Sequence, residues 1–482
     1  MPEGLRWGSR RCAKDTLGSG RNTRTARKFG VIIAGPSPTI VSRLNHPAAV
    51  LALAFLCAIA IGSVLLWLPA ARAGDGAAPA LVALFTATSA VCVTGLVVVD
   101  TGTYWSPLGQ AIILGLFQLG GFGIMTAATL LGLLVNRQLR LRSKLLLQAE
   151  THTLGVGDLK SVAKLVFAVT VATEAVVALV LSVRFALAYD FPWREAVWHG
   201  IFHSVSAFNN AGFSTWPDNV SRFVADALVL VPLMLAIVLG GIGFPVLHEL
   251  WRSRSSPRPL SIHASLTLWG TAGLLLGGAV MLLLVEWDNP RTLGGLDWPS
   301  RVLAAIFTST SARTAGFNAI DIGGLTLESL NLHYLLMFIG GGSAGTAGGV
   351  KITTFFVLLL IVWSEVRGYA DVEFKGRRLA NQAQRQALTI LVLSAGTVVV
   401  ATMVIVPMTP IPFEKVVFEV ISAFATVGLS TGITAELPPA AQLVLVFLMF
   451  AGRVGIVTLA AAIAVNVVRR SYRFPEERPI VG

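Results

Sequence analysis

Four glycines recur in one local pattern, in which a Phe is followed four residues later by Ser-Ala and then by the glycine. The four segments cover residues 85–95, 202–212, 307–316 and 418–428. Glycine takes unusual backbone conformations without a Cβ penalty, so successive carbonyl groups of each strip can face one axis. Four such strips around one axis would form rings of backbone oxygens, and such rings replace the water shell of a dehydrated cation.

The residues expected to line this filter are each glycine and the two residues before it. They are Val93, Thr94, Gly95, Asn210, Ala211, Gly212, Thr314, Ala315, Gly316, Thr426, Val427 and Gly428. No strip carries Asp or Glu between Ser-Ala and the glycine, whereas calcium favours carboxylate ligands. The neutral carbonyls therefore indicate a large monovalent cation, and potassium is the ion expected at these oxygens.

Polar residues beside the strips have expected structural roles. Arg313 is the one charged residue within the strips. It could bridge carbonyl groups behind the third strip or pair with an outer acid such as Asp321, and either role is favoured over ion binding. Asn209 and Asn210 could place side-chain oxygens near the path, but they are expected to hold the second strip through backbone hydrogen bonds. Cys92 is expected to be a small packing residue rather than a redox sensor.

A short helix is expected to position each strip. A proline precedes every segment, at positions 79, 192, 299 and 412, and proline suits the first turn of a helix. From the proline to Ser-Ala each helix has about 10–15 residues, too few to cross the membrane, so it is expected to be re-entrant. Each lies between two long apolar segments, near 47–69 and 106–136, 163–186 and 225–250, 263–286 and 330–363, and 387–409 and 438–468.

The composition indicates a membrane protein. Of the 482 residues, 54% are hydrophobic and 13% are charged. Uncharged runs cover 48–68, 104–136, 227–248, 264–285, 386–413 and 454–468. A helix of about 20 apolar residues crosses the hydrocarbon core, and only helices or closed barrels satisfy the backbone there. The expected fold is an all-α integral membrane protein of four membrane helix–pore loop–membrane helix repeats around one pore, with eight full spans and four re-entrant half helices.

The expected organisation is a basic cytoplasmic tail at 1–46, repeats at 47–136, 160–252, 262–365 and 386–470, and a C-terminal cytoplasmic tail at 471–482. Basic residues set the orientation. The tails and the loops on their side carry 27 Lys and Arg residues, against eight in the opposite loops. Positively charged loops stay in the cytoplasm, so both termini are expected inside the cell. The N-terminal tail has no apolar run of its own, which argues against a signal peptide.

A glycine-rich run interrupts the second long segment of the third repeat. It consists of Gly340, Gly341, Gly342, Ser343, Ala344, Gly345, Thr346, Ala347, Gly348 and Gly349. Each glycine costs a helix about 1 kcal/mol relative to alanine, so a flexible loop that breaks the span is favoured over a small-residue helix contact. Arg453 lies in the last apolar segment, where an arginine usually faces a cavity or a partner. The run, Lys351 and Arg453 form the predicted gate, with a purely structural role as the alternative.

Other functional classes fit the sequence less well. The net charge of +12 follows the topology rather than a nucleic-acid surface, and the seven His residues have no metal-ligand spacing. No grouping of His, Asp and Ser suggests an enzyme or a covalent cofactor, and Cys12, Cys57 and Cys92 suggest no disulfide framework. A secondary carrier with inverted repeats would show broken helices but not four parallel pore loops. Glu174 and Glu419 are expected to be paired or accessible to water.

Residues 45–470 resemble the Trk/Ktr/HKT superfamily of potassium transporters. The stretch 81–103 is similar to the superfamily's first filter, and 208–215, 310–318 and 425–432 are similar to the other three. The glycine-rich run resembles its intramembrane gating loop, and 452–455 resembles its pore arginine motif. Because no extra pair of spans precedes residue 47, the chain looks most like the bacterial KtrB type and less like the longer TrkH type.

The resemblance implies potassium uptake across the plasma membrane by a homodimer in membrane lipid, with one pore in each subunit. It also implies a docked cytoplasmic ring of nucleotide-binding regulatory subunits of the KtrA/TrkA kind. Some members are stimulated by sodium, which makes Na⁺ a candidate activator. The first filter glycine is often serine in sodium-selective relatives, so Gly95 favours potassium. A sodium or mixed monovalent cation transporter of the same fold stays the alternative.

Overall fold

The computed structural model describes residues 47–123, 157–255 and 259–455 of the chain. The predicted tails at 1–46 and 471–482 lie outside the described residues. So do most of the basic loop at 137–164 and the ends of two expected spans, at 124–136 and 456–468.

A long helix begins each repeat. The four are α2 (Pro47–Trp67), α6 (Gly157–Ala188), α10 (Ile262–Glu286) and α14 (Asn381–Ile405). In the described part of the chain, these four are long and apolar enough to cross a membrane. Their outward faces are apolar as well, since Leu187, Trp269 and Leu284 are 71%, 72% and 72% exposed. Extended exposed apolar surface of this kind marks contact with a membrane or a partner.

A short helix follows each long one. The four are α3 (Ala80–Val91), α7 (Trp193–Phe208), α11 (Trp298–Ser311) and α15 (Phe413–Phe424). Pro79, Pro192 and Pro412 are the N-cap residues of three of them, and Pro299 lies in the first turn of α11. Each helix ends within two residues of its Ser-Ala pair, where the chain turns into the strip.

A further apolar element closes each repeat. These elements are Pro107–Gly123, α8 (Ala227–Ile242), α12 (Leu327–Phe338) with α13 (Ile352–Val366), and α16 (Pro439–Val454). The expected single span at 225–250 is instead broken, because α9 (Phe244–Ser255) leaves α8 at an angle of 98°. The break falls at Gly243, whose φ of 94° suits a residue without Cβ. Gly455, with φ of 90°, ends α16 in the same way.

Within residues 47–123, 157–255 and 259–455, the expectation of an all-α chain has one exception, an antiparallel hairpin of β1 (Glu373–Phe374) and β2 (Arg377–Arg378). Its turn residues, Lys375 and Gly376, both have positive φ, the geometry that matches the twist of a two-residue hairpin. The hairpin lies inside the basic segment 365–385. Smaller helical elements are α4 (Thr101–Tyr104), η1 (Pro69–Ala71), η2 (Ser221–Phe223), η3 (Ile322–Gly324) and η4 (Val406–Met408).

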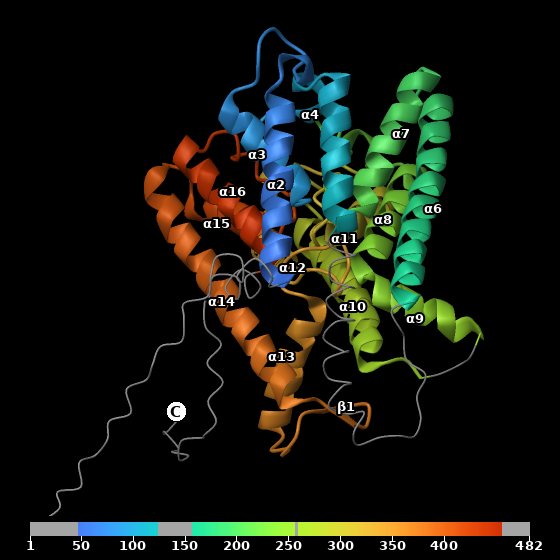
Figure 1. Cartoon of the computed structure of the whole chain (residues 1–482), viewed down its shortest axis with the longest axis vertical. Coiled ribbons are helices and arrows are strands. Elements are labelled where there is room, and N and C mark those ends of the chain that lie inside the picture. Colours follow the sequence, from blue (N-terminus) through green and yellow to red (C-terminus); the bar gives the residue numbers. More distant parts are fainter. Residues whose placement is uncertain (1–46, 124–156, 256–258, 456–482) are drawn as a thin grey trace, which may run out of the picture. The chain divides into compact units, whose positions relative to one another are not determined.

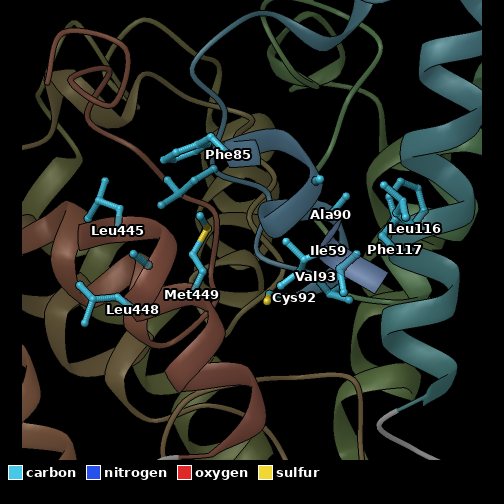
Figure 2. Close-up of a cluster of buried hydrophobic side chains, with 14 of the residues drawn as sticks. Ile59, Phe85, Ala90, Cys92, Val93, Leu116, Phe117, Leu445, Leu448 and Met449 are labelled. Carbon is cyan, nitrogen blue, oxygen red and sulfur yellow. The ribbon is translucent and has the colours of Figure 1, made fainter. Parts of the chain in front are cut away.

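Each short helix packs against the long helices of its own repeat. In the second repeat α6 lies beside α7 and α8, and in the fourth α15 lies between α14 and α16 (Figure 1). The first repeat shows the packing in detail (Figure 2). Phe85 of α3 and Val93 of the first strip belong to one buried apolar cluster with Ile59, Phe117 and Met449. This packing fixes the point at which the first strip begins.

Candidate functional site

The four repeat glycines meet in a closed ring. A Cβ placed on Gly95 would overlap the carbonyl oxygen of Ala211 and would lie 3.1 Å from the Cα of Gly212. A Cβ placed on Gly212 would lie 2.9 Å from the Cα of Gly316. On Gly316 it lies 3.2 Å from the Cα of Gly428, and on Gly428 it lies 3.1 Å from the Cα of Gly95. Segments far apart in sequence thus converge on one point, in chain order around the ring.

Backbone oxygens surround this ring. The carbonyl oxygen before each glycine lies beside the glycine of the preceding repeat, and the four oxygens belong to Thr94, Ala211, Ala315 and Val427. The glycines have φ between 69° and 94°. The residues two positions earlier also have positive φ: Val93 (55°), Asn210 (58°), Thr314 (71°) and Thr426 (50°). Positive φ is rare for residues that carry a Cβ, so tertiary contacts must hold it.

A serine of each short helix holds the strip that follows it. Ser422 Oγ accepts a hydrogen bond from the Gly428 N–H at 3.2 Å and donates to the Leu429 carbonyl at 2.6 Å. Ser89 Oγ accepts from the Gly95 N–H at 3.1 Å. The matching serines of the other repeats donate to the carbonyl that follows the glycine: Ser206 to Phe213 and Ser311 to Phe317. The repeated Ser-Ala pair therefore has a geometric role that its sequence pattern did not reveal.

The side chains of the two asparagines in the second strip form hydrogen bonds with groups behind the strip. Asn209 donates to the Val205 carbonyl at 2.9 Å and to Glu174 Oε1 at 3.2 Å. Gln118 completes this group, because it accepts from Asn209 at 2.5 Å and donates to Glu174 Oε2 at 3.2 Å. Glu174 is thus buried and paired with amides. With its amide oriented to satisfy its neighbours, Asn210 donates to two backbone carbonyls at 3.1 Å. Both asparagines hold the strip through backbone bonds.

Arg313 lies behind the third strip and is 6% exposed. Its guanidinium donates to the Gly340 carbonyl at 2.9 Å and to the Thr271 carbonyl at 3.4 Å. Of the two expected partners, carbonyl groups are confirmed and the outer acid is wrong, since Asp321 pairs instead with Arg291 at 2.7 Å. The third strip is therefore linked directly to the start of the glycine-rich run.

The glycine-rich run does not continue α12. It lies against the end of α8, where Gly342 N donates to the Gly241 carbonyl at 2.8 Å and Thr346 N donates to the Gly240 carbonyl at 3.1 Å. On its other side, a Cβ on Gly348 would overlap the side chain of Thr426, in the fourth strip. The run thus passes between the second and fourth repeats, next to the beginning of the strips.

Besides Arg313, two further basic side chains donate to the same run. Arg453 is 4% exposed and donates to the Thr346 carbonyl, with a second, longer contact of 3.4 Å to the Gly120 carbonyl. Lys351 donates to the Ala347 carbonyl at 2.5 Å. All the predicted gate residues therefore lie in one contiguous group, and Arg453 bridges it to the first repeat.

Sequence reasoning missed a second set of glycines, in the closing helices. A Cβ at any of these positions would overlap the carbonyl oxygen at the end of the short helix in the same repeat. The pairs are Gly120 with Val91, Gly240 with Phe208, and Gly452 with Phe424. A Gly-Gly or Ala-Gly pair late in each closing helix is the signal that could have found them. These glycines let the closing helices approach the base of the strips.

Cys92 lies beside the first strip. Cys92 is fully buried in the apolar cluster of the first repeat (Figure 2), as its predicted packing role requires. Among the residues that the structure describes, no three His, Cys, Asp or Glu side chains come together to hold a metal ion.

Known proteins are similar to this chain in sequence and in fold. The family model for TrkH, described as a cation transport protein, matches residues 38–471. The Ktr system potassium uptake protein B of Bacillus subtilis (strain 168) is 37% identical, over 90% of this chain and 97% of that protein. The potassium/sodium uptake protein NtpJ of Enterococcus hirae is 34% identical, over 92% of this chain and 98% of that protein.

A solved structure shows the same architecture. The crystal structure of the potassium transporter TrkH from Vibrio parahaemolyticus matches with a TM-score of 0.69 and 18% identity, over 88% of this chain and 86% of that chain. The likeness establishes the fold, and the relatives establish the family, so the resemblance predicted from the repeats is confirmed. The protein is a multi-pass membrane protein, and it belongs to the TrkH family of cation transport proteins.

Proposed function

We propose that this protein carries potassium ions across the plasma membrane through one path lined by the four strips. The observation that carries the proposal is the glycine ring, which brings four backbone carbonyls to one point in the absence of any carboxylate within the strips. Carbonyl rings replace the water shell of a monovalent cation. The printed names of the relatives, a potassium uptake protein and a potassium/sodium uptake protein, support the choice of ion.

The proposed architecture of the chain has eight full spans and four re-entrant helices, α3, α7, α11 and α15. Both termini lie in the cytoplasm. The ends of the re-entrant helices lead directly into the strips. The C-terminus of a helix carries a partial negative charge, which favours a cation at the ring. The excess of basic residues in the tails and in the loops on their side supports the orientation.

The proposed gate is the glycine-rich run with Lys351 and Arg453. Its support is the position of the run between the second and fourth repeats and the hydrogen bonds that Lys351 and Arg453 donate to it. A positive charge at this depth opposes a passing cation, as in other pores. Movement of the run away from Arg453 would open the path.

The proposed assembly is a homodimer that docks a cytoplasmic ring of nucleotide-binding regulatory subunits. The name of the Bacillus subtilis relative, which describes it as part of a Ktr system, supports a multi-component assembly. The basic segment 365–385, with its β1–β2 hairpin, offers a docking surface. An isolated chain whose transport is already complete and unaffected by any cytoplasmic subunit would contradict this assembly.

A sodium or mixed monovalent cation transporter is the second candidate, and the name of the Enterococcus hirae relative favours it. Purified protein in liposomes should take up rubidium, a potassium substitute, in preference to sodium. The same gene should restore growth of potassium-requiring cells, and comparison with and without sodium tests sodium stimulation. Equal uptake of both ions would favour the mixed transporter, and failure to take up either would contradict transport by this chain.

A further inference from the structure

The residue that follows the repeated Phe of each short helix holds the same place in all four repeats, but its chemistry differs. The four residues are Thr86, His203, Thr308 and Glu419, and all are at most 2% exposed. Each lies one turn before the serine that holds its strip. Because the repeats place these side chains equivalently, differences in their hydrogen bonds can be compared directly.

In the fourth repeat, Glu419 binds the chain just beyond the filter glycine. One carboxylate oxygen accepts from Ser430 Oγ at 2.6 Å and from the Thr431 N–H at 2.9 Å. The other accepts from Thr434 Oγ1 at 2.9 Å. In the described part of the chain, no Lys or Arg forms an ion pair with this carboxylate. The acid is therefore satisfied entirely by the outer end of its own strip.

In the second repeat, His203 makes the equivalent contact. Its Nε2 lies 2.9 Å from Ser214 Oγ, and Ser214 stands two residues after its filter glycine, as Ser430 does. Its Nδ1 lies 2.8 Å from the His199 carbonyl, so Nδ1 carries the proton and Nε2 is the acceptor that faces the Ser214 hydroxyl, which also lies 3.2 Å from the Asn219 carbonyl oxygen. The ring also stacks on Trp216 at 4.2 Å. The His203 imidazole and the Glu419 carboxylate thus make the same kind of contact, a hydrogen bond from the short helix to the residues just beyond the filter glycine. This contact is called a brace below.

The other two repeats lack this brace. The hydroxyl oxygens of Thr86 and Thr308 are buried and have no hydrogen-bond partner among the described residues. Each glycine of the ring faces the glycine of the next repeat, so the second and fourth repeats lie on opposite sides of it. The two braces therefore lie on the diagonal of the ring that joins the second and fourth repeats. The diagonal that joins the first and third repeats has no brace.

We propose that Glu419 and His203 are specificity-determining positioning residues, which set the spacing of the filter oxygens across one diagonal by fixing Ser430, Thr431 and Ser214. The inference rests on the proposed function. A small ion requires the ring to close more tightly than potassium does, and selectivity is lost when a carbonyl ring can adjust its width. Two opposed braces resist that adjustment without touching the ion.

The test uses the full-length protein in liposomes and measures how sodium competes with rubidium uptake. Glu419→Leu and His203→Phe remove the acceptor atoms, and His203→Phe keeps an aromatic ring against Trp216. Each should reduce the discrimination between the two ions about tenfold, an effect that the loss of even one buried hydrogen bond allows. Glu419→Gln and His203→Gln keep an acceptor within reach of the serines, so each should restore most of the discrimination.

Thr86→Val and Thr308→Val are the matched controls, because they alter the same position in the two repeats without a brace. Both should keep the discrimination of the unaltered protein. Ser430→Ala removes one of the three hydrogen bonds to Glu419, so it should reproduce part of the loss in Glu419→Leu. Combining the two should add little to Glu419→Leu alone, because the shared contact is then already lost. Ser430→Ala also carries the test if Glu419→Leu does not fold.

The outcomes separate this inference from the proposed function. Unaltered protein that takes up no rubidium contradicts the proposed function. Normal uptake with unchanged discrimination in Glu419→Leu, His203→Phe and Ser430→Ala overturns the braces alone. Discrimination lost equally in Glu419→Gln and Glu419→Leu, or in the threonine controls, also overturns them, because charge or packing would then explain the effect.

Discussion

The guanidinium of Arg313 donates to the carbonyl oxygen of Gly340 at 2.9 Å, which joins the third filter strip to the first residue of the glycine-rich run. The same side chain reaches the Thr271 carbonyl of α10 at 3.4 Å. Arginine suits this position because its planar group can donate in two directions while its charge stays fixed. A change in the position of the run therefore acts on the strip as well.

Arg313→Lys should loosen the glycine-rich run. Lysine keeps the positive charge but lacks the planar fork that reaches both carbonyls. A hydrogen bond from a charged group contributes about 1.5–3 kcal/mol, so rubidium flux per folded molecule should rise by about tenfold. The matched control is Arg291→Lys, which alters an exposed ion pair with Asp321 and should leave flux unchanged. Unchanged or reduced flux in Arg313→Lys, at normal folding, would contradict the link.

Gly95→Ser should admit sodium. The added Cβ would overlap the Ala211 carbonyl, and the φ of 89° at this position is costly for any residue other than glycine. The ring must shift to relieve the overlap, so sodium should compete with rubidium more strongly. Gly115→Ser is the control, because a Cβ there meets no atom within 4 Å. Unchanged preference for rubidium in Gly95→Ser would argue strongly against the filter assignment.

Arg453→Ala should raise flux and reduce dependence on any cytoplasmic partner. The change removes a buried positive charge and frees the Thr346 carbonyl, so the closed position of the run loses stability. Deletion of residues 340–349 should act in the same direction. Phe447→Ala is the control on the same helix, since Phe447 is 56% exposed. The measurement is rubidium flux per folded molecule. Normal or lower flux in both gate variants would contradict the gate and favour a purely structural role for the run and Arg453.

Ser422→Ala should weaken ion binding at the fourth strip. The hydroxyl group holds the Gly428 N–H and the Leu429 carbonyl, and leaving buried groups unpaired costs about 1–3 kcal/mol. The rubidium concentration for half-maximal uptake should therefore rise, by about tenfold. Ser63→Ala removes a hydroxyl that binds only its own helix, at the Ile59 carbonyl, and should change nothing. Identical uptake curves for the two variants would contradict the role given to Ser422.

Local sequence was enough to predict the long helices that begin the repeats, the short helices and the four strips. Apolar runs mark the long helices because hydrocarbon excludes charge and unpaired backbone, and Pro79, Pro192 and Pro412 mark where three of the short helices begin. The repeated glycines identify the ring residues because only glycine tolerates both the φ and the close approach found there. The glycine-rich run was recognisable for the same reason.

Only the tertiary structure decided which parts meet. The order of the glycines around the ring depends on contacts between segments far apart in the chain, and no local pattern records such contacts. The same is true of the partner of Arg313, where the sequence left carbonyl groups and Asp321 open, and of Glu419, whose partners lie more than ten residues after it in the chain. The break at Gly243 escaped prediction because a glycine within an apolar run fits a helix or a bend equally well, and packing of the glycine-rich run against α8 selects the bend.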